Sequence, residues 1–164
     1  MKEEILGGFV SSSLIAFIMG FLVFFMILFL ALYIYLGFAF MAIGRKAKLK
    51  TPELAWIPFV GPLIIAYQAS KMHWWPWLIW IIVPITFLVV FINPLLGILM
   101  MFIFLVFFLV FFVFTVIWEW KMFEAVNKPG WWALIKLGQI IPLAGLLFFI
   151  AQLILYGIAA WSKD

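Results

Sequence analysis

Long apolar runs without a charged residue dominate this chain. The first extends from Leu14 to Ile43 and would be about 45 Å long as a helix, more than the hydrocarbon thickness of a bilayer. Hydrophobic residues make up 70% of the 164 positions, which is more apolar surface than one soluble core of this size buries. The chain is therefore predicted to be an all-α integral membrane protein forming a single transmembrane domain over residues 1–164.

Four of the apolar runs are long enough to cross the membrane. The predicted spans cover residues 14–43, 75–92, 95–118 and 133–160. Between the second and third spans, Asn93-Pro94 predicts a tight reversal, because one helix over 75–118 would be about 66 Å long.

A fifth apolar segment, 54–69, is interrupted by Pro58, Gly61 and Pro62. Even as a continuous helix it would be only about 24 Å long, so we expect it to re-enter or to lie at the interface. A crossing by this segment, which would make five spans, is the alternative.

The distribution of Lys and Arg distinguishes these two topologies, because cytoplasmic loops carry the excess. If 54–69 crosses, the ten basic residues divide five to five. If it does not cross, they divide eight to two, with only Lys2 and Lys163 outside. The sequence therefore predicts a multi-pass cell-membrane protein with both termini outside. Nine of the ten tryptophans then fall at cytoplasmic ends, in the headgroup layer that indoles prefer.

Basic residues near the predicted cytoplasmic surface are expected to contact anionic lipid headgroups. They are Arg45, Lys46, Lys48, Lys50, Lys71 and Lys128. The net charge is +4 and the longest basic run is short, so nucleic acid is not an expected partner. Membrane lipids, other membrane subunits or a second copy of the chain are the expected partners.

Groups that support catalysis are scarce. The chain has no cysteine and one histidine, His73. Glu119 and Glu124 are expected on an amphipathic cytoplasmic helix over 119–126, and Lys136 is expected to reach the cytoplasmic surface. No catalytic, metal or cofactor site is predicted, and the protein is not expected to be an enzyme.

A few polar or small residues inside the apolar segments are candidates for specific contacts. Gln68, Gln139 and Gln152 are expected either to bond neighbouring helices or to line a polar path. Ser12, Ala16 and Gly20 repeat at four-residue spacing, the pattern that allows close helix packing within the chain or with a second copy.

One pattern occurs twice in the sequence. Ile57-Pro58, Gly61 and Gln68 have the same spacing as Ile141-Pro142, Gly145 and Gln152. Repeated broken helices are typical of transporter sites, but a reused packing device gives the same pattern.

The segment from Trp120 to Trp132, which contains Lys128-Pro129-Gly130-Trp131-Trp132, resembles a motif of small prokaryotic multi-spanning membrane proteins with a domain of unknown function. In that family an interfacial Lys-x-Gly-Trp segment leads into a span broken at Ile-Pro or Leu-Pro. The resemblance covers about residues 54–85 and 119–145 and implies no catalytic residue. Here Lys136-Leu137-Gly138-Gln139 replaces the Pro and Asn that often follow the Trp in the family.

Together these features predict a non-enzymatic accessory, scaffold or assembly subunit of a membrane complex. A small oligomeric channel or transporter lined by the Pro-broken helices is the alternative.

Overall fold

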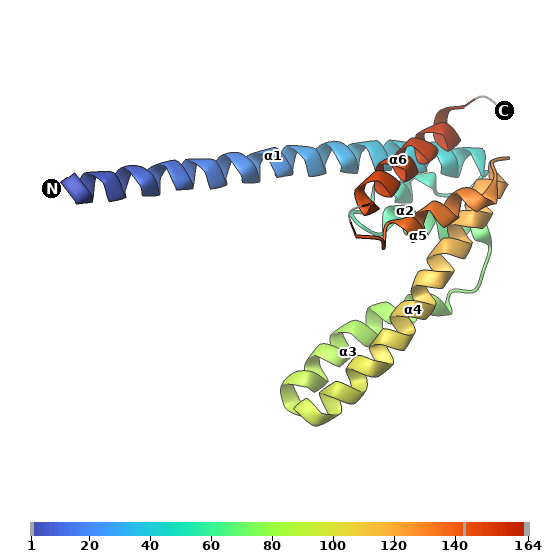
Figure 1. The fold of residues 1–164 in the computed structure, drawn as a ribbon. Helices are drawn as coiled ribbons and strands as arrows, with labels where there is room; N and C mark the ends of the chain where they lie inside the picture. The colour runs from blue at the N-terminus through green and yellow to red at the C-terminus, as the bar shows by residue number, and fades with distance from the viewer. Residues whose placement is uncertain (1, 143, 163–164) are drawn as a thin grey trace. The chain divides into compact units, whose positions relative to one another are not determined.

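The computed structural model describes residues 2–142 and 144–162, with side chains from residue 14 onward. Every regular element among the described residues is helical, which confirms the predicted all-α class. Three helical segments in this part of the chain are long and apolar enough to cross a membrane: Leu14–Lys46, Trp75–Ile92 and Pro94–Ala125. The elements follow one another as α1 (Lys2–Lys46), η1 (Pro52–Trp56), α2 (Gly61–Ser70), η2 (Trp75–Leu78), α3 (Ile79–Ile92), α4 (Pro94–Ala125), η3 (Gly130–Leu134), α5 (Ile135–Gly138) and α6 (Gly145–Trp161) (Figure 1).

The chain divides into two compact units, Met1–Leu36 and Gly37–Asp164. The first consists of the N-terminal part of α1, which begins at Lys2 and so starts well before the serines at 11–13. In the most apolar part of this helix no residue is buried. A helix that is apolar on all faces needs lipid or protein around it. This unit therefore agrees with the predicted membrane class.

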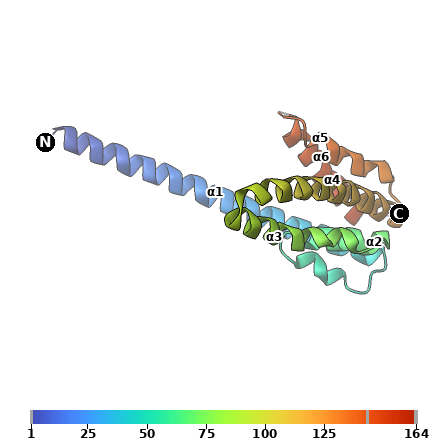
Figure 2. The ribbon, with the colours of Figure 1, turned by 90° about the horizontal axis from the view of Figure 1, so that it is seen from below.

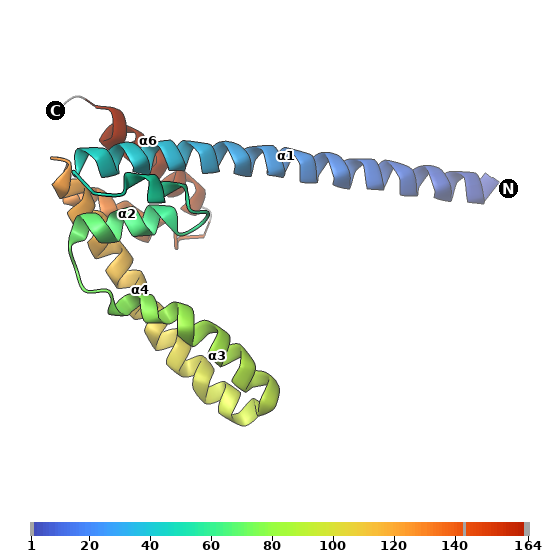
Figure 3. The same ribbon diagram turned by 180° about the vertical axis from the view of Figure 1, so that it is seen from behind.

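In the second unit, α3 and α4 form an antiparallel hairpin (Figure 3). The predicted reversal at Asn93-Pro94 is present. Asn93 Oδ1 accepts hydrogen bonds from the backbone N–H groups of Leu95 (3.0 Å) and Leu96 (3.3 Å). Pro94 occupies the first turn of α4, where its missing N–H has no cost. An Asn cap followed by Pro thus starts α4 as soon as α3 ends.

The segment after α1 folds back along the last turns of that helix. A Cβ atom at Gly44 would lie 3.1 Å from Pro52, and one at Gly37 would lie 2.8 Å from the ring of Trp56, so η1 runs antiparallel to α1. The chain then reverses, and α2 returns until Ile65 lies beside Gly44. The predicted break at Pro58 is therefore the turn of a short helical hairpin.

The segment after α4 folds back in the same way. Trp120 packs on Gly130, η3 runs back along α4, and α5 follows η3 with Lys136 paired to Glu119 of α4. The chain reverses between Gly138 and Gly145, so that α6 returns beside them. Figure 2 shows α4 between α2 on one side and α5 and α6 on the other.

The predicted span over 133–160 is therefore not one helix. The break is stabilised by its own backbone bonds, from Ile141 N to the Gly138 carbonyl (3.1 Å) and from Gly145 N to the Ile141 carbonyl (2.8 Å). Pro142 has no N–H group to continue the hydrogen bonds of a helix. A tight turn therefore pairs the neighbouring backbone N–H and carbonyl groups better than a kinked helix would.

The core of the second unit is aromatic, and Trp118 is at its centre with no exposed surface. Its ring stacks on Trp77, with centroids 5.8 Å apart and an interplanar angle of 18°, and Tyr67 meets it edge-on at 5.3 Å. Trp118 is at the end of an apolar run in the chain, and α2 and η2 cover it.

Candidate functional site

Both long helices end in the same local structure, which positions a basic residue after α1. Lys48 N donates to the Arg45 carbonyl (3.0 Å) and Leu49 N to the Gly44 carbonyl (3.0 Å), the two bonds of a Schellman motif. The motif requires a left-handed residue, and Lys48 has φ 56°. α4 ends in the same pair of bonds, with Asn127 (φ 57°) as the left-handed residue.

An open pocket of about 580 Å³ lies where α2 returns to the loop after α1. Residues from both segments line it: Lys48, Leu49, Lys50, Thr51, Tyr67, Gln68, Lys71 and Met72. The Gln68 amide is 3.4 Å from the Thr51 hydroxyl and joins the two sides. Lys71, the left-handed cap of α2 (φ 53°), completes the rim.

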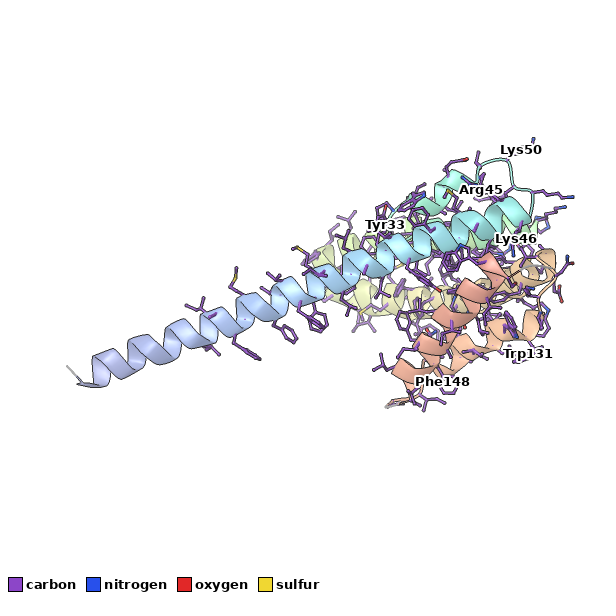
Figure 4. The ribbon with its side chains drawn as sticks, turned by 90° about the horizontal axis from the view of Figure 1, so that it is seen from above. Tyr33, Arg45, Lys46, Lys50, Trp131 and Phe148 are labelled. Carbon is purple, nitrogen blue, oxygen red and sulfur yellow. The ribbon has the colours of Figure 1, made fainter. Side chains whose placement is uncertain are left out.

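The structure separates the six basic residues that were predicted to contact headgroups. Lys48, Lys50 and Lys71 surround this pocket, and none of them has an ion-pair partner among the described residues. Figure 4 shows Arg45, Lys46 and Lys50 at the same end of α1.

The other three basic residues have different surroundings. Arg45 is exposed and contacts Met41 Sδ at 3.5 Å. Lys46 donates to the carbonyl oxygens of Ala159 (3.1 Å) and Ser162 (2.6 Å) at the end of α6. Lys128 is half-buried after the Schellman motif of α4.

The contacts of Lys46 bear on topology. They place the end of α6 beside the end of α1, within one compact unit. The orientation expected from the sequence, with Lys46 cytoplasmic and the C-terminal end outside, stays a prediction. The reversal before Gly145 sends α6 back toward the end of α1.

A buried polar cluster joins α4, α5 and α6. Glu119 is 3% exposed, and its carboxylate forms an ion pair with the Lys136 ammonium group. The Gln152 amide donates to the same carboxylate at 3.3 Å. The expectation that Glu119 lies on the polar face of an amphipathic helix is thus wrong, because the side chain is buried, whereas Lys136 is only half-buried. They neutralise each other inside the fold, and α5 is tied to α4 by this pair.

This pair was missed in the sequence, although a signal was present. Lys136 is the one charged residue between Lys128 and Lys163, and Glu119 is the first after Lys71. Isolated charges in apolar segments are expensive unless they pair. That reasoning selects both residues, but the fold-back of α5 is needed to bring them together.

The structure does not bring the three glutamines to one path. Gln68 is at the lysine-lined pocket, whereas Gln152 is 2% exposed and bonded to Glu119. Gln139 is half-buried in the turn before α6 and does not line that pocket. Gln152 Oε1 is buried and has no hydrogen-bond partner among the described residues.

The repeated Ile-Pro pattern has a structural counterpart. Gly61 N donates to the Ile57 carbonyl (2.8 Å) as Gly145 N donates to the Ile141 carbonyl (2.8 Å), and each glycine starts the returning helix. In each case a Cβ atom would overlap the preceding arm, at Ala55 or at Gln139. The repeat is thus a reused hairpin that returns to the end where its long helix stops.

The predicted small-residue face has no partner within the described chain. The Ser12 side chain lies outside the described residues, Ala16 is exposed, and a Cβ atom at Gly20 would meet nothing within 4 Å. No group of three or more His, Cys, Asp or Glu residues that could hold a metal ion occurs among the described residues. His73 is exposed and follows Met72, a lining residue of the pocket, in the chain.

No protein-family model, curated protein or solved structure matches the chain.

Proposed function

We propose that the chain is a polytopic membrane protein with three spans and two re-entrant hairpins. The spans are α1, the helix from η2 through α3, and α4. The hairpins cover 52–70 and 130–161. The two ends of each hairpin are on the same side as the end of α1 at Lys46. Two contacts support this topology: Lys46 with the Ser162 carbonyl, and Lys48 beside Lys71 around one pocket.

The charge distribution favours the same topology. With three spans and two hairpins, Lys2 is the one basic residue outside, and the other nine of the ten Lys and Arg residues are cytoplasmic. This asymmetry is stronger than the eight-to-two division of the four-span topology, and cytoplasmic loops are where the excess belongs. The N-terminus is then outside and the C-terminal end of α6 is inside.

The proposed role is that of an accessory or scaffold subunit in a membrane complex. The observation that carries it is the contrast between the two units. In the second unit the Glu119 carboxylate pairs with Lys136 and accepts from Gln152, whereas the most apolar part of α1, in the first unit, presents apolar side chains on every face. A permeation path needs converging polar groups. The separation of Gln68 from Gln152 therefore favours the scaffold over the channel.

Cysteine labelling tests the topology. Single cysteines at Lys48, Asn127 and Ser162 are expected to resist an impermeant thiol reagent in intact cells and to react after permeabilisation. A cysteine at Asn93 is expected to react in intact cells. Labelling of Ser162 together with Asn93 would instead return α6 to a full span.

Photo-crosslinking tests the role. A photoreactive residue at Phe17 or Phe24, which are 72% and 61% exposed on α1, is expected to yield one protein adduct of defined mass. Phe102, 66% exposed on α4, is the matched control and is expected to yield lipid adducts. Lipid adducts at all three positions, together with ion flux in proteoliposomes, would contradict the scaffold role.

A further inference from the structure

The pocket between the loop after α1 and the end of α2 has an unusual lining for an apolar protein. Three of its eight residues are lysines, and no carboxylate is among them. We propose that this pocket binds the phosphate of an anionic membrane lipid, with a phosphomonoester headgroup preferred. The proposal rests on the membrane location proposed above and adds a ligand class to it.

The charge balance selects an anion. Lys48, Lys50 and Lys71 contribute three positive charges that no described carboxylate neutralises. The C-terminal ends of α1 and α2 contribute about half a negative charge each, so the sum remains positive. Ammonium groups around an open pocket favour phosphate over a cation or a neutral group.

Neutral donors complete the polar side of the pocket. The Gln68 amide and the Thr51 hydroxyl are joined by a long hydrogen bond of 3.4 Å. A bond of this length is weak, so both groups can turn toward phosphate oxygens at small cost. A phosphomonoester offers more acceptor oxygens and more charge than a diester, which suits three lysines and two neutral donors.

Backbone conformation holds two of the lysines at the rim. Lys48 and Lys71 both have left-handed φ angles, 56° and 53°, at positions where glycine is the usual residue. Each is the cap of a helix end, so its Cα is fixed by the hydrogen bonds of the turn. The two lysine side chains therefore extend from fixed Cα positions on two different segments that line the pocket.

The rest of the lining explains why the phosphate belongs to a lipid. Leu49, Met72 and Tyr67 offer apolar surface that a free phosphate ion does not use. Trp74 and Trp75, which are 61% and 37% exposed, come two and three residues after Met72, the last residue of the lining. Exposed indoles next to a basic rim are typical of the headgroup layer, where the glycerol and first acyl carbons of a bound lipid would meet them.

The test uses the full-length protein in a zwitterionic detergent and short-chain lipids as probes. Dioctanoyl phosphatidic acid is expected to bind and dioctanoyl phosphatidylcholine is not, as measured by native mass spectrometry. In Lys48→Gln/Lys71→Gln the dissociation constant is expected to rise about tenfold, because two charge-assisted contacts are lost. Arg45→Gln/Lys121→Gln, which removes the same charge from exposed residues outside the pocket, is the matched control and is expected to change it less than about twofold.

Each remaining outcome bears on the proposal. Equal losses in the two double variants would show a diffuse charge effect and overturn the site. Inorganic phosphate or glycerol 3-phosphate competing as well as the lipid would overturn the lipid source. Gln68→Leu keeps all three lysines and is expected to raise the dissociation constant as well. It tests the site even if the double lysine variant does not fold. The topology is measured separately, by cysteine labelling in cells. A failure of the proposed topology is therefore distinguishable from a failure of lipid binding.

Discussion

The ammonium group of Lys46 lies 2.6 Å from the backbone carbonyl oxygen of Ser162, so the last turn of α1 caps the last turn of α6. A cation at a helix C-terminus satisfies free carbonyl groups and opposes the partial negative charge of the helix end. This contact joins the end of α6 to the end of α1.

Lys46→Met is expected to loosen the end of α6. Two hydrogen bonds from a charged donor are lost, each worth about 1.5–3 kcal/mol. Amide hydrogen exchange over residues 157–162 is expected to be faster, with little change in α3. Arg45→Met is the control, since the Arg45 side chain is exposed and does not contact α6. Equal exchange rates in the two variants would refute the capping role.

The Glu119–Lys136 pair is expected to behave as a buried ion pair in a mutant cycle. Lys136→Met leaves the carboxylate buried and is expected to cost about 3 kcal/mol, seen as a lower Tm in detergent. Glu119→Leu/Lys136→Met removes both charges and is expected to recover most of the loss. Glu124→Gln is the control, because Glu124 is exposed. A double variant less stable than Lys136→Met would contradict this assignment.

Gly61→Ala and Gly145→Ala are expected to destabilise the two hairpins. A Cβ atom at Gly61 would lie 2.6 Å from the carbonyl carbon of Ala55, and one at Gly145 would lie 2.7 Å from the Gln139 carbonyl oxygen. Backbone atoms cannot rotate away, so a cost of about 1–3 kcal/mol is expected for each in thermal unfolding.

Gly20→Ala is the control for these substitutions, because nothing lies within 4 Å of its Cβ position. It is expected to leave the Tm of the monomer unchanged. A change in oligomeric state with Gly20→Ala would support the predicted packing face at Ala16 and Gly20 in a second copy. A similar loss of stability in all three glycine variants would remove the steric explanation.

Trp118→Ala is expected to cost about 3–5 kcal/mol, because a wholly buried indole is replaced by a cavity. Trp74→Ala, where the ring is 61% exposed, is expected to change the Tm by less than a quarter of that loss. Thermal unfolding in detergent compares the two. Equal losses would mean that Trp118 is not a core residue.

Composition and local patterns were sufficient for the helical membrane class, for the reversal at Asn93-Pro94, and for the breaks at Pro58 and Pro142. These features depend on residues close together in the chain: an Asn cap, the N–H that proline lacks, and runs of apolar side chains. The sequence also shows that Lys48 and Lys50 belong together, because only Leu49 separates them in one loop.

The direction of each segment after a break depended on contacts between distant residues. Residues 133–160 have the length of a span, and the sequence does not reveal that α6 returns to Lys46. Glu119 and Lys136 are paired because α5 folds back along α4, and Lys71 joins Lys48 because α2 folds back along η1. Apolar residues surround nearly every helix, so periodicity does not indicate which face packs. A fold-back forms where it buries rings and pairs charges, and that gain exists only in the assembled unit.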